Sequence, residues 1–295
     1  MENLKVSYNY KKNRDKLFAN LISIIDGILS DGVLQDDEIL YLSTWLLEAD
    51  AIADNDIVKL LVMRINRILE DGIITEDERS ELKEELASIQ KNLMDLPSLD
   101  LYSKESDINL LIGLCKGLIA DRKLSEHEVR YLNWWLTVNG ALKNNYPGKH
   151  LYECVTEVLA DGVITKDESE FLYNELVAFT GCDVELGVVD GMTTKLPTDH
   201  IEPSMINSST FCLTGKFLSG KRADVAEKIK KHGGVIDKSV RQRTNFLVVG
   251  TLSSRDWVYS SFGRKIEQTL EWKTSGVSDI KIITEDQLMT VLPAS

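Results

Sequence analysis

Residues 1–186 carry one short acidic motif at four places, and its spacing limits the folds open to this part of the chain. In each copy an Asp precedes a tight-turn residue, apolar residues and an acidic helix start; that residue is Gly in three copies and Arg122 in the third. The separations of 40, 50 and 40 residues make the second half repeat the first at an offset of 90. We therefore predict a duplicated structural unit. The copies begin at Asp31, Asp71, Asp121 and Asp161.

The residues of each copy are those that end one helix and begin the next. Gly72 can take the left-handed conformation that closes one helix, and Thr75 with Glu78 makes a capping box that opens the next. The motif therefore predicts helix, turn and helix in every copy, in an all-α region. Other pairs keep the offset: Leu21 and Leu111, Gly27 and Gly117, Glu38 and Glu128, Tyr41 and Tyr131, Trp45 and Trp135, Thr75 and Thr165, Glu78 and Glu168.

Calcium binding is an alternative interpretation of the same motif, because its second part resembles the end of an EF-hand loop. In that register Glu78 takes the last ligand position, while the first and third positions fall on Arg67 and Leu69. Leucine offers no oxygen to a hard cation. Only the fourth copy, with Glu157, gains an oxygen ligand at the first position. Helix capping is therefore favoured over calcium.

Residues 209–295 have another pattern, in which short apolar runs end at glycine. Phe211–Leu213 precedes Thr214 and Gly215, and Phe246–Val249 precedes Gly250. Runs of this kind predict central strands of a small sheet. The order strand, helix, strand, strand, helix, strand, helix predicts a four-stranded parallel sheet flanked by helices. The other expected elements are helices at 224–231, 265–272 and 284–292 and strands at 235–236 and 280–283.

This carboxyl-terminal segment resembles a BRCT domain. The motifs are TFCLTGKF from Thr210, HGGVI from His232, TNFLVVG from Thr244, and Arg264-Lys265 at a helix start. The pattern is similar to the BRCT domains that end bacterial NAD-dependent DNA ligases and to that of the eukaryotic clamp-loader large subunit. The resemblance implies phosphate binding by the Thr214 hydroxyl, the Gly215 N–H and Lys265. It also matches Arg222 to an arginine that the clamp-loader domain places on the 5′-phosphate end of duplex DNA.

The chemistry of phosphate recognition agrees with these residue types. A phosphate needs hydrogen-bond donors and positive charge, and the amino end of a helix adds to both. A purely structural turn at Thr214-Gly215 and a solvated Lys265 are the alternative. One visible BRCT copy favours DNA ends over phosphopeptides, and a basic stretch without interleaved aromatic residues favours duplex over single strands. Further contacts to the DNA backbone are expected from Lys216, Lys221, Arg241, Arg243 and Arg264.

Charge is divided unevenly along the chain. Residues 209–295 carry 14 Lys and Arg against 9 Asp and Glu, about +5, whereas the preceding residues carry 20 against 38, about −18. The net charge of −13 thus combines a mildly basic part with a strongly acidic one. Because the acidic part repels nucleic acid, we expect any DNA contact in the carboxyl-terminal part.

The sequence suggests four segments: helical halves at 1–96 and 104–186, a linker at 187–208, and the BRCT-like segment at 209–295. The linker is inferred from its Gly, Pro, Thr and Ser content and weak apolar periodicity. The acidic pattern of the helical halves resembles tellurite-resistance B-like domains of bacteria. That resemblance implies a compact helical fold for both halves.

No catalytic motif accompanies these segments. The chain has no phosphate-binding P-loop, nucleophile elbow or HExxH sequence, so we expect a protein that is not an enzyme and needs no cofactor. No apolar run is long enough to cross a membrane, and we expect a cytoplasmic location. The cysteines and histidines suggest reduced core thiols and no metal site. They are Cys115, Cys154, Cys182, Cys212, His127, His150, His200 and His232.

These features suggest a non-enzymatic DNA-binding adaptor of bacterial or phage type. Its BRCT-like segment would recognise a DNA 5′-phosphate end or nick, and its helical part would bind a partner protein or a second copy of itself. Trp134, replaced by Thr44 in the other half, is the candidate contact, with a buried ring as the alternative. The main alternative function is a scaffold whose BRCT-like segment binds a protein or phosphopeptide. Autoinhibition by the acidic part, and the choice among repair, replication and phage defence, stay open.

Overall fold

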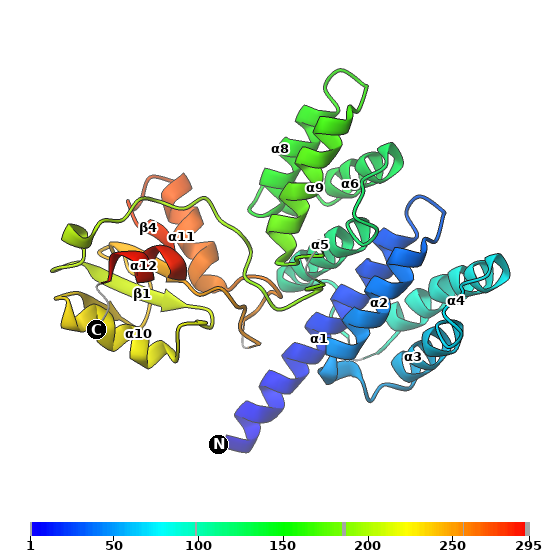
Figure 1. Cartoon of the computed structure of the whole chain (residues 1–295), viewed down its shortest axis with the longest axis horizontal. Helices are drawn as coiled ribbons and strands as arrows, with labels where there is room; N and C mark the ends of the chain where they lie inside the picture. The colour runs from blue at the N-terminus through cyan, green and yellow to red at the C-terminus, as the bar shows by residue number, and fades with distance from the viewer. Residues whose placement is uncertain (1, 98, 185–186, 256, 293–295) are drawn as a thin grey trace. The chain divides into compact units, whose positions relative to one another are not determined.

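The computed structural model of the chain describes residues 2–97, 99–184, 187–255 and 257–292, with side chains described from residue 10 onward (Figure 1). The chain divides into two compact units, Met1–Asp190 and Gly191–Ser295. Residues 1, 98, 185–186, 256 and 293–295, which belong to predicted segments or their junctions, lie outside the described residues.

The first unit is all-α, and its halves have the same order of long helices. The first half contains α1 (Glu2–Ile28), α2 (Asp36–Glu48), η1 (Asp50–Ile52), α3 (Asp56–Ile68) and α4 (Glu76–Met94). The second contains α5 (Lys104–Leu118), α6 (Glu126–Val138), α7 (Gly140–Lys143), α8 (Gly148–Val158) and α9 (Lys166–Thr180). Helices α2 and α6 begin 90 residues apart, and so do α4 and α9. The predicted all-α duplication is confirmed.

The acidic motifs close and open helices in this unit. The Asp of each copy accepts a hydrogen bond from the N–H two residues later, at 2.8 to 3.0 Å. The Glu seven residues after that Asp accepts one from the backbone N–H of the N-cap residue, at 2.7 to 2.9 Å. The turn residue is left-handed in every copy, with φ between 66° and 80°. The motif's carboxylates are thus engaged in local capping.

Helices α1 and α5 cross where their backbones touch. A Cβ atom on Gly117 would lie 2.4 Å from the carbonyl oxygen of Ile24, and one on Gly27 would lie 2.9 Å from the Cα of Gly117. Gly27 and Gly117 are equivalent residues of the two halves. Because equivalent residues meet each other, the halves are related by a local two-fold axis at this crossing. Leu21 and Leu111 are fully buried nearby on the same two helices.

The second unit contains a parallel sheet of four strands. Its strands follow the order β2-β1-β3-β4, and every pairing is parallel. The elements are β1 (Thr210–Thr214), α10 (Arg222–Lys231), β2 (Val235–Asp237), β3 (Phe246–Val249), α11 (Arg264–Thr274), β4 (Lys281–Thr284) and α12 (Glu285–Val291), preceded by the short η2 (Pro203–Met205). The four-stranded parallel sheet is confirmed, and Thr284 with Gln287 forms the expected capping box before α12.

The two faces of the sheet carry different side chains. Phe211 and Leu213 of β1 belong to a core that also includes Val225 of α10 and Leu288 of α12. Because side chains alternate along a strand, Cys212 and Thr214 point to the opposite face. The strands end together, since Thr214 pairs with Val249 and Val249 with Thr284. The carboxyl ends of β1, β3 and β4 therefore form one edge of the sheet.

The segment predicted as a linker, 187–208, is divided between the two units. Val189 is buried in the first unit, and its carbonyl accepts a hydrogen bond from Tyr41 Oη at 3.3 Å. Ile201 and Ile206 are buried in the core of the second unit. Asp199 lies beside β4, where its N–H donates to the Ile282 carbonyl at 2.7 Å. The two ends of the segment are therefore folded parts of the two units.

All four cysteines are buried and free of disulfides. Among the described residues, no helix combines the length and apolar character needed to cross a bilayer.

Candidate phosphate-binding site

The end of β1 forms the centre of the candidate site. Thr214 is the last residue of the strand and is buried, and Gly215 follows with a left-handed φ of 80°. The Thr214 carbonyl accepts a hydrogen bond from the Gly250 N–H at 2.9 Å. A Cβ atom on Gly250 would lie 2.3 Å from the Lys216 carbonyl oxygen. The glycines that end both apolar runs are therefore required by close backbone packing at this edge.

Two cations reach the backbone on either side of Thr214. Lys265 Nζ donates to the Leu213 carbonyl at 2.9 Å, and Arg222 Nη2 donates to the Gly215 carbonyl at 2.7 Å. Lys265 is the second residue of α11 and Arg222 the first residue of α10, so both side chains start at helix amino ends. The structure thus brings together all four residues predicted to bind phosphate.

The face of the sheet next to Lys265 is the one that carries Thr214. Burial raises the pKa of the Cys212 thiol, while the Lys265 ammonium beside it acts in the opposite direction. Cys212 and Thr214 share this face by strand alternation. The amino end of α11 has Gly263 at its N-cap, and the first N–H groups of a helix favour an anion. The Thr214 side chain, the Lys265 ammonium and the amino end of α11 therefore lie at the same end of the sheet.

Glu285 organises the loop that follows the site, and sequence reasoning did not identify it. Its carboxylate accepts hydrogen bonds from the N–H groups of Leu218, Ser219 and Thr251, at 3.0, 2.6 and 3.3 Å. Burial raises the pKa of Glu285, but the hydrogen bonds led by that from Ser219 outweigh it and the pKa is lowered. A charged Glu285 thus ties the loop after β1 to the loop after β3. An acidic residue in a first helical turn gives no sequence signal of such distant partners.

A second unpredicted contribution comes from residues 191–194. Thr193 Oγ1 donates to the Gly250 carbonyl at 2.9 Å, and the Thr194 N–H donates to the Ser261 carbonyl at 2.9 Å. Gly250 adjoins Thr214, and Ser261 lies just before α11. The start of the second unit is therefore built into the same edge of the sheet as the candidate site.

The other predicted basic residues fall into two groups. Lys216, Lys221 and Arg264 are exposed and adjoin site residues in the chain. Arg241 and Arg243 are exposed in the connection that leads to the amino end of β3, at the opposite edge of the sheet from Thr214. Arg243 is also paired with Asp237 at 3.2 Å. The structure does not bring these two arginines together with the candidate site.

Trp134, the predicted partner contact, lies on α6 of the first unit. Its side chain is 55% exposed, and its ring centroid is 5.4 Å from that of Tyr131. Val138, one helical turn later, is also exposed. The structure thus places Trp134 at the surface, and Thr44 at the equivalent position of the other half is exposed as well.

Comparison with known proteins identifies the second unit. Residues 206–292 match the family model described as the BRCA1 C Terminus (BRCT) domain. The chain is similar to a DNA ligase of Prochlorococcus marinus, 32% identical over 91 residues, which are 31% of this chain and 11% of the ligase. A DNA ligase of Thermosipho africanus is 30% identical over 102 residues, 35% of this chain and 13% of the ligase.

A third similarity is longer. A DNA ligase of Anoxybacillus flavithermus is 28% identical over 225 residues, which are 74% of this chain and 31% of the ligase. The chain therefore spans between about a tenth and a third of the length of these curated relatives. The family match, the parallel sheet and the order of its helices together show that residues 206–292 of this chain are a BRCT domain.

Proposed function

We propose that the BRCT domain binds a phosphate group at the carboxyl end of β1, through Thr214, Gly215, Lys265 and Arg222. The observation that supports this most directly is the placement of the two cations, which donate to the carbonyls of residues 213 and 215. A phosphate offers stronger acceptors than a neutral carbonyl, because both donor and acceptor are then charged. Both side chains are therefore held next to the position where such a ligand would bind.

The ligand that we favour is the 5′-phosphate of a DNA end or nick. The segment 209–295 carries about +5, so it attracts a polyanion, and Lys216, Lys221 and Arg264 extend its exposed positive charge beyond the pocket. The similar proteins are named as DNA ligases, which agrees with a DNA ligand. Arg241 and Arg243 lie at the other edge of the sheet, so we assign them a weaker contribution through long-range charge only.

The proposal is tested by binding of the full chain to recessed duplex DNA with either a 5′-phosphate or a 5′-hydroxyl. Loss of one hydrogen bond to a charged group costs about 1.5–3 kcal/mol. The double variant Thr214→Ala with Lys265→Glu should therefore lose at least about 100-fold in affinity for the phosphorylated end. Fluorescence anisotropy at physiological salt measures this, and circular dichroism checks the fold.

The matched control is the double variant Arg241→Glu with Arg243→Glu. It changes the charge of the domain more than the site variant does, but at the opposite edge of the sheet. We expect this variant to bind both kinds of DNA end more weakly and to the same extent, so that the preference for the 5′-phosphate is unchanged. Equal affinity of the unaltered chain for phosphorylated and hydroxyl ends would contradict the proposed ligand. Tight binding of a phosphoserine peptide in its place would favour the scaffold function.

For the helical unit we propose partner binding through Trp134, in a chain that works by binding rather than by catalysis. The exposure of Trp134 and Val138 on one face of α6 supports this, because large exposed aromatic residues are enriched at interfaces. A second copy of the chain is the first partner to test. Light scattering should show concentration-dependent association that Trp134→Ala reduces, while Thr44→Ala in the equivalent position leaves it unchanged.

A further inference from the structure

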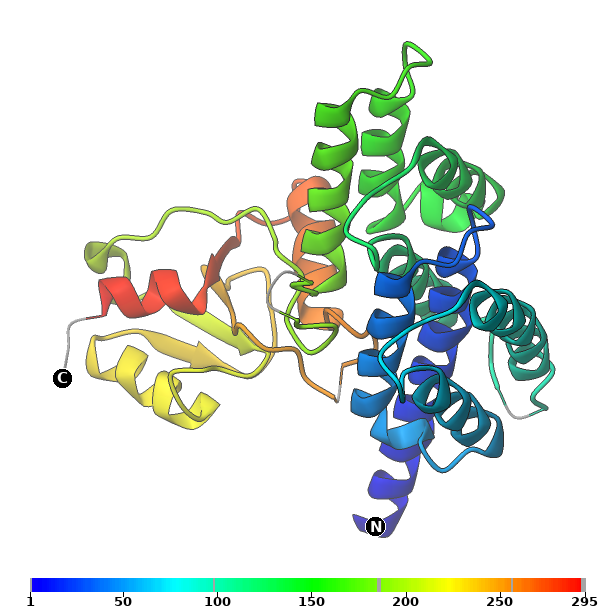
Figure 2. The same cartoon turned by 45° about the vertical axis from the view of Figure 1, so that its right-hand side comes forward.

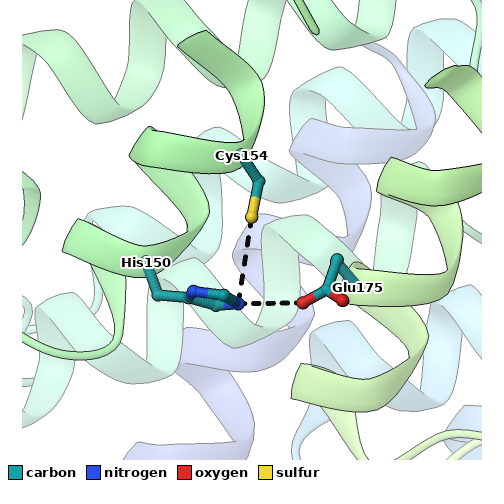
Figure 3. A group of neighbouring side chains, drawn as sticks. All are labelled: His150, Cys154 and Glu175. Atoms are coloured by element: carbon teal, nitrogen blue, oxygen red, sulfur yellow. Dashed lines mark hydrogen bonds and ion pairs between the residues drawn. The ribbon is translucent and has the colours of Figure 1, made fainter. Parts of the chain in front are cut away.

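Three side chains with metal-binding atoms meet between α8 and α9 in the first unit. His150 and Cys154 lie four residues apart on α8, which places them on one face of that helix, and Glu175 reaches them from α9 (Figure 3). The two helices lie side by side in both views (Figures 1 and 2). The group was missed in the sequence because the Glu is 21 residues beyond the Cys.

The distances are short enough for one ion to contact all three residues. His150 Nε2 is 2.8 Å from Glu175 Oε2 and 3.8 Å from Cys154 Sγ, and all three atoms lie within 4.8 Å of one another. Tetrahedral zinc separates such ligand atoms by about 3.3–3.7 Å. Side-chain rotations that move the ligand atoms by about 1 Å therefore convert this hydrogen-bonded arrangement into a coordination shell. Within the described part of the chain, no other such cluster of His, Cys, Asp and Glu atoms is found.

The duplication provides an internal comparison for this site. At an offset of 90 residues, Cys154 corresponds to Arg64, and Glu175 corresponds to Glu85. In the first half Arg64 Nε is ion-paired with Glu85 Oε2 at 3.1 Å, which ties α3 to α4 through opposite charges. His150 takes the place of the exposed Leu60. The flanking core leucines are the same in both halves: Leu61 and Leu151, Leu86 and Leu176.

The two halves differ in the chemistry of this contact between helices. If the only role of this position were to hold two helices together, the arginine of the first half would be sufficient. The second half retains the carboxylate, loses the guanidinium and gains a thiol and an imidazole. Both new groups are ligands for a soft or borderline cation. A metal ion bound there would supply the positive charge that Arg64 supplies to Glu85.

We propose that His150, Cys154 and Glu175 bind one zinc ion. A thiolate with an imidazole and one carboxylate suits zinc, whereas calcium and magnesium prefer oxygen ligands alone. Cys154 is 7% exposed, while the His150 side chain is 57% exposed. The ion can therefore enter from solvent, and a water molecule completes the fourth position. The Cys154 thiol loses its proton to solvent as the zinc–sulfur bond forms.

The experiment uses the full chain without an affinity tag, freed of metal by a chelator and dialysed. Zinc chloride is titrated by calorimetry, and bound zinc is measured by elemental analysis. We expect one equivalent of zinc. Cobalt chloride is titrated in parallel, because cobalt bound to a thiolate absorbs in the near ultraviolet. Cys154→Ser should abolish this band, and His150→Ala should weaken zinc binding by at least about 100-fold.

Two controls separate the site from general effects. His127 is an exposed histidine on α6, and His127→Ala should leave the zinc titration unchanged. The double variant His150→Leu with Cys154→Arg reproduces the residues of the first half, so it should fold with an Arg–Glu pair and bind no zinc. The proposal is overturned if the unaltered chain binds no zinc saturably, if its cobalt complex lacks the thiolate band, or if Cys154→Ser binds zinc as tightly as the unaltered chain.

Discussion

Arg122 has a backbone conformation that its side chain disfavours. Its φ is 66°, in the left-handed region, where the other three motif copies have Gly32, Gly72 and Gly162. A side chain with a Cβ atom costs about 1–2 kcal/mol there, partly offset because glycine is more flexible in the unfolded chain. We expect Arg122→Gly to raise the free energy of unfolding by about 0.5–1 kcal/mol. Urea denaturation measures this change. Gly162→Ala should have the opposite effect, and stabilisation by both substitutions would contradict the explanation.

Two equivalent glutamates make stability depend on pH. Burial raises the pKa of Glu38 to about 9 and that of Glu128 to about 7, from an ordinary value of 4.5. The folded state therefore retains protons that the unfolded state releases. Their stabilising contribution is complete below about pH 4.5 and is lost as the pH rises through 7 and 9. The charged groups that act on Glu38 include Asp31 and Asp121. Asp37 and Lys123 in turn act on Asp121.

We therefore expect the melting temperature to fall between about pH 5 and pH 9. The double variant Glu38→Gln with Glu128→Gln should flatten this dependence, because neither amide titrates. Differential scanning calorimetry across the range tests it. A melting temperature that rises with pH in the unaltered chain would show that these carboxyls are ionised in the folded state. Glu78, in an equivalent but less buried position, is a contrast, since the hydrogen bond from the Thr75 backbone lowers its pKa.

Among the helices, the crossing of α1 and α5 has the least tolerance for added volume. Gly117→Ala would place a methyl group 2.4 Å from the Ile24 carbonyl, and neither backbone can move without separating the halves. Overpacking of a rigid core typically costs about 1–3 kcal/mol, and we expect the upper end here. Thermal unfolding followed by circular dichroism measures the loss. Gly140→Ala is the control, since a Cβ atom there meets nothing within 4 Å. Equal stability of the two variants would contradict the close crossing.

Among the strands, the apolar runs in the sequence predict which residues form strands but not which distant residues contact them. The apolar runs at Phe211–Leu213 and Phe246–Val249 predicted two buried parallel strands, and both are confirmed. The same runs do not indicate that Glu285, from the start of α12, closes the loop after β1. Its partners in that loop, Leu218 and Ser219, are 67 and 66 residues away in the chain, and long-range contacts leave no mark on local periodicity. The predicted site residues Thr214 and Lys265 were found through the BRCT resemblance, because the family motif joins segments that local patterns treat separately.

For the chain as a whole, the boundary of the BRCT unit has a measurable consequence. Ile201 and Ile206 precede the predicted boundary at residue 209 but are buried in the core of the second unit. Each buried isoleucine contributes about 1.5–3 kcal/mol. A fragment of residues 209–295 should therefore be less stable than one of residues 191–295 by roughly 3 kcal/mol or more. Urea unfolding of both fragments tests this, and equal midpoints would show that residues 191–208 do not stabilise the unit.

The duplication also gives the molecule two copies of one helical unit whose side chains differ at a few equivalent positions. Equivalent helix pairs are tied by Arg64 and Glu85 in the first half and carry His150, Cys154 and Glu175 in the second. A buried Trp45 has the half-buried Trp135 as its counterpart, while Trp134 is exposed beside it. The shared positions maintain the fold, and the positions that diverged carry our proposals for zinc and partner binding.

The BRCT fold was predicted from the family resemblance, while local patterns in the amino acids were enough to predict the helix caps, the duplication and the order of strands and helices along the chain. Each of these depends on residues within a few positions of one another or on a repeat of fixed length, so neighbours in the chain contain the information. Contacts between distant segments required the folded chain. They include the docking of residues 191–208 on the BRCT unit, the Glu285 clamp, and the meeting of Cys154 with Glu175. Packing brings these residues together, and packing depends on the whole chain at once.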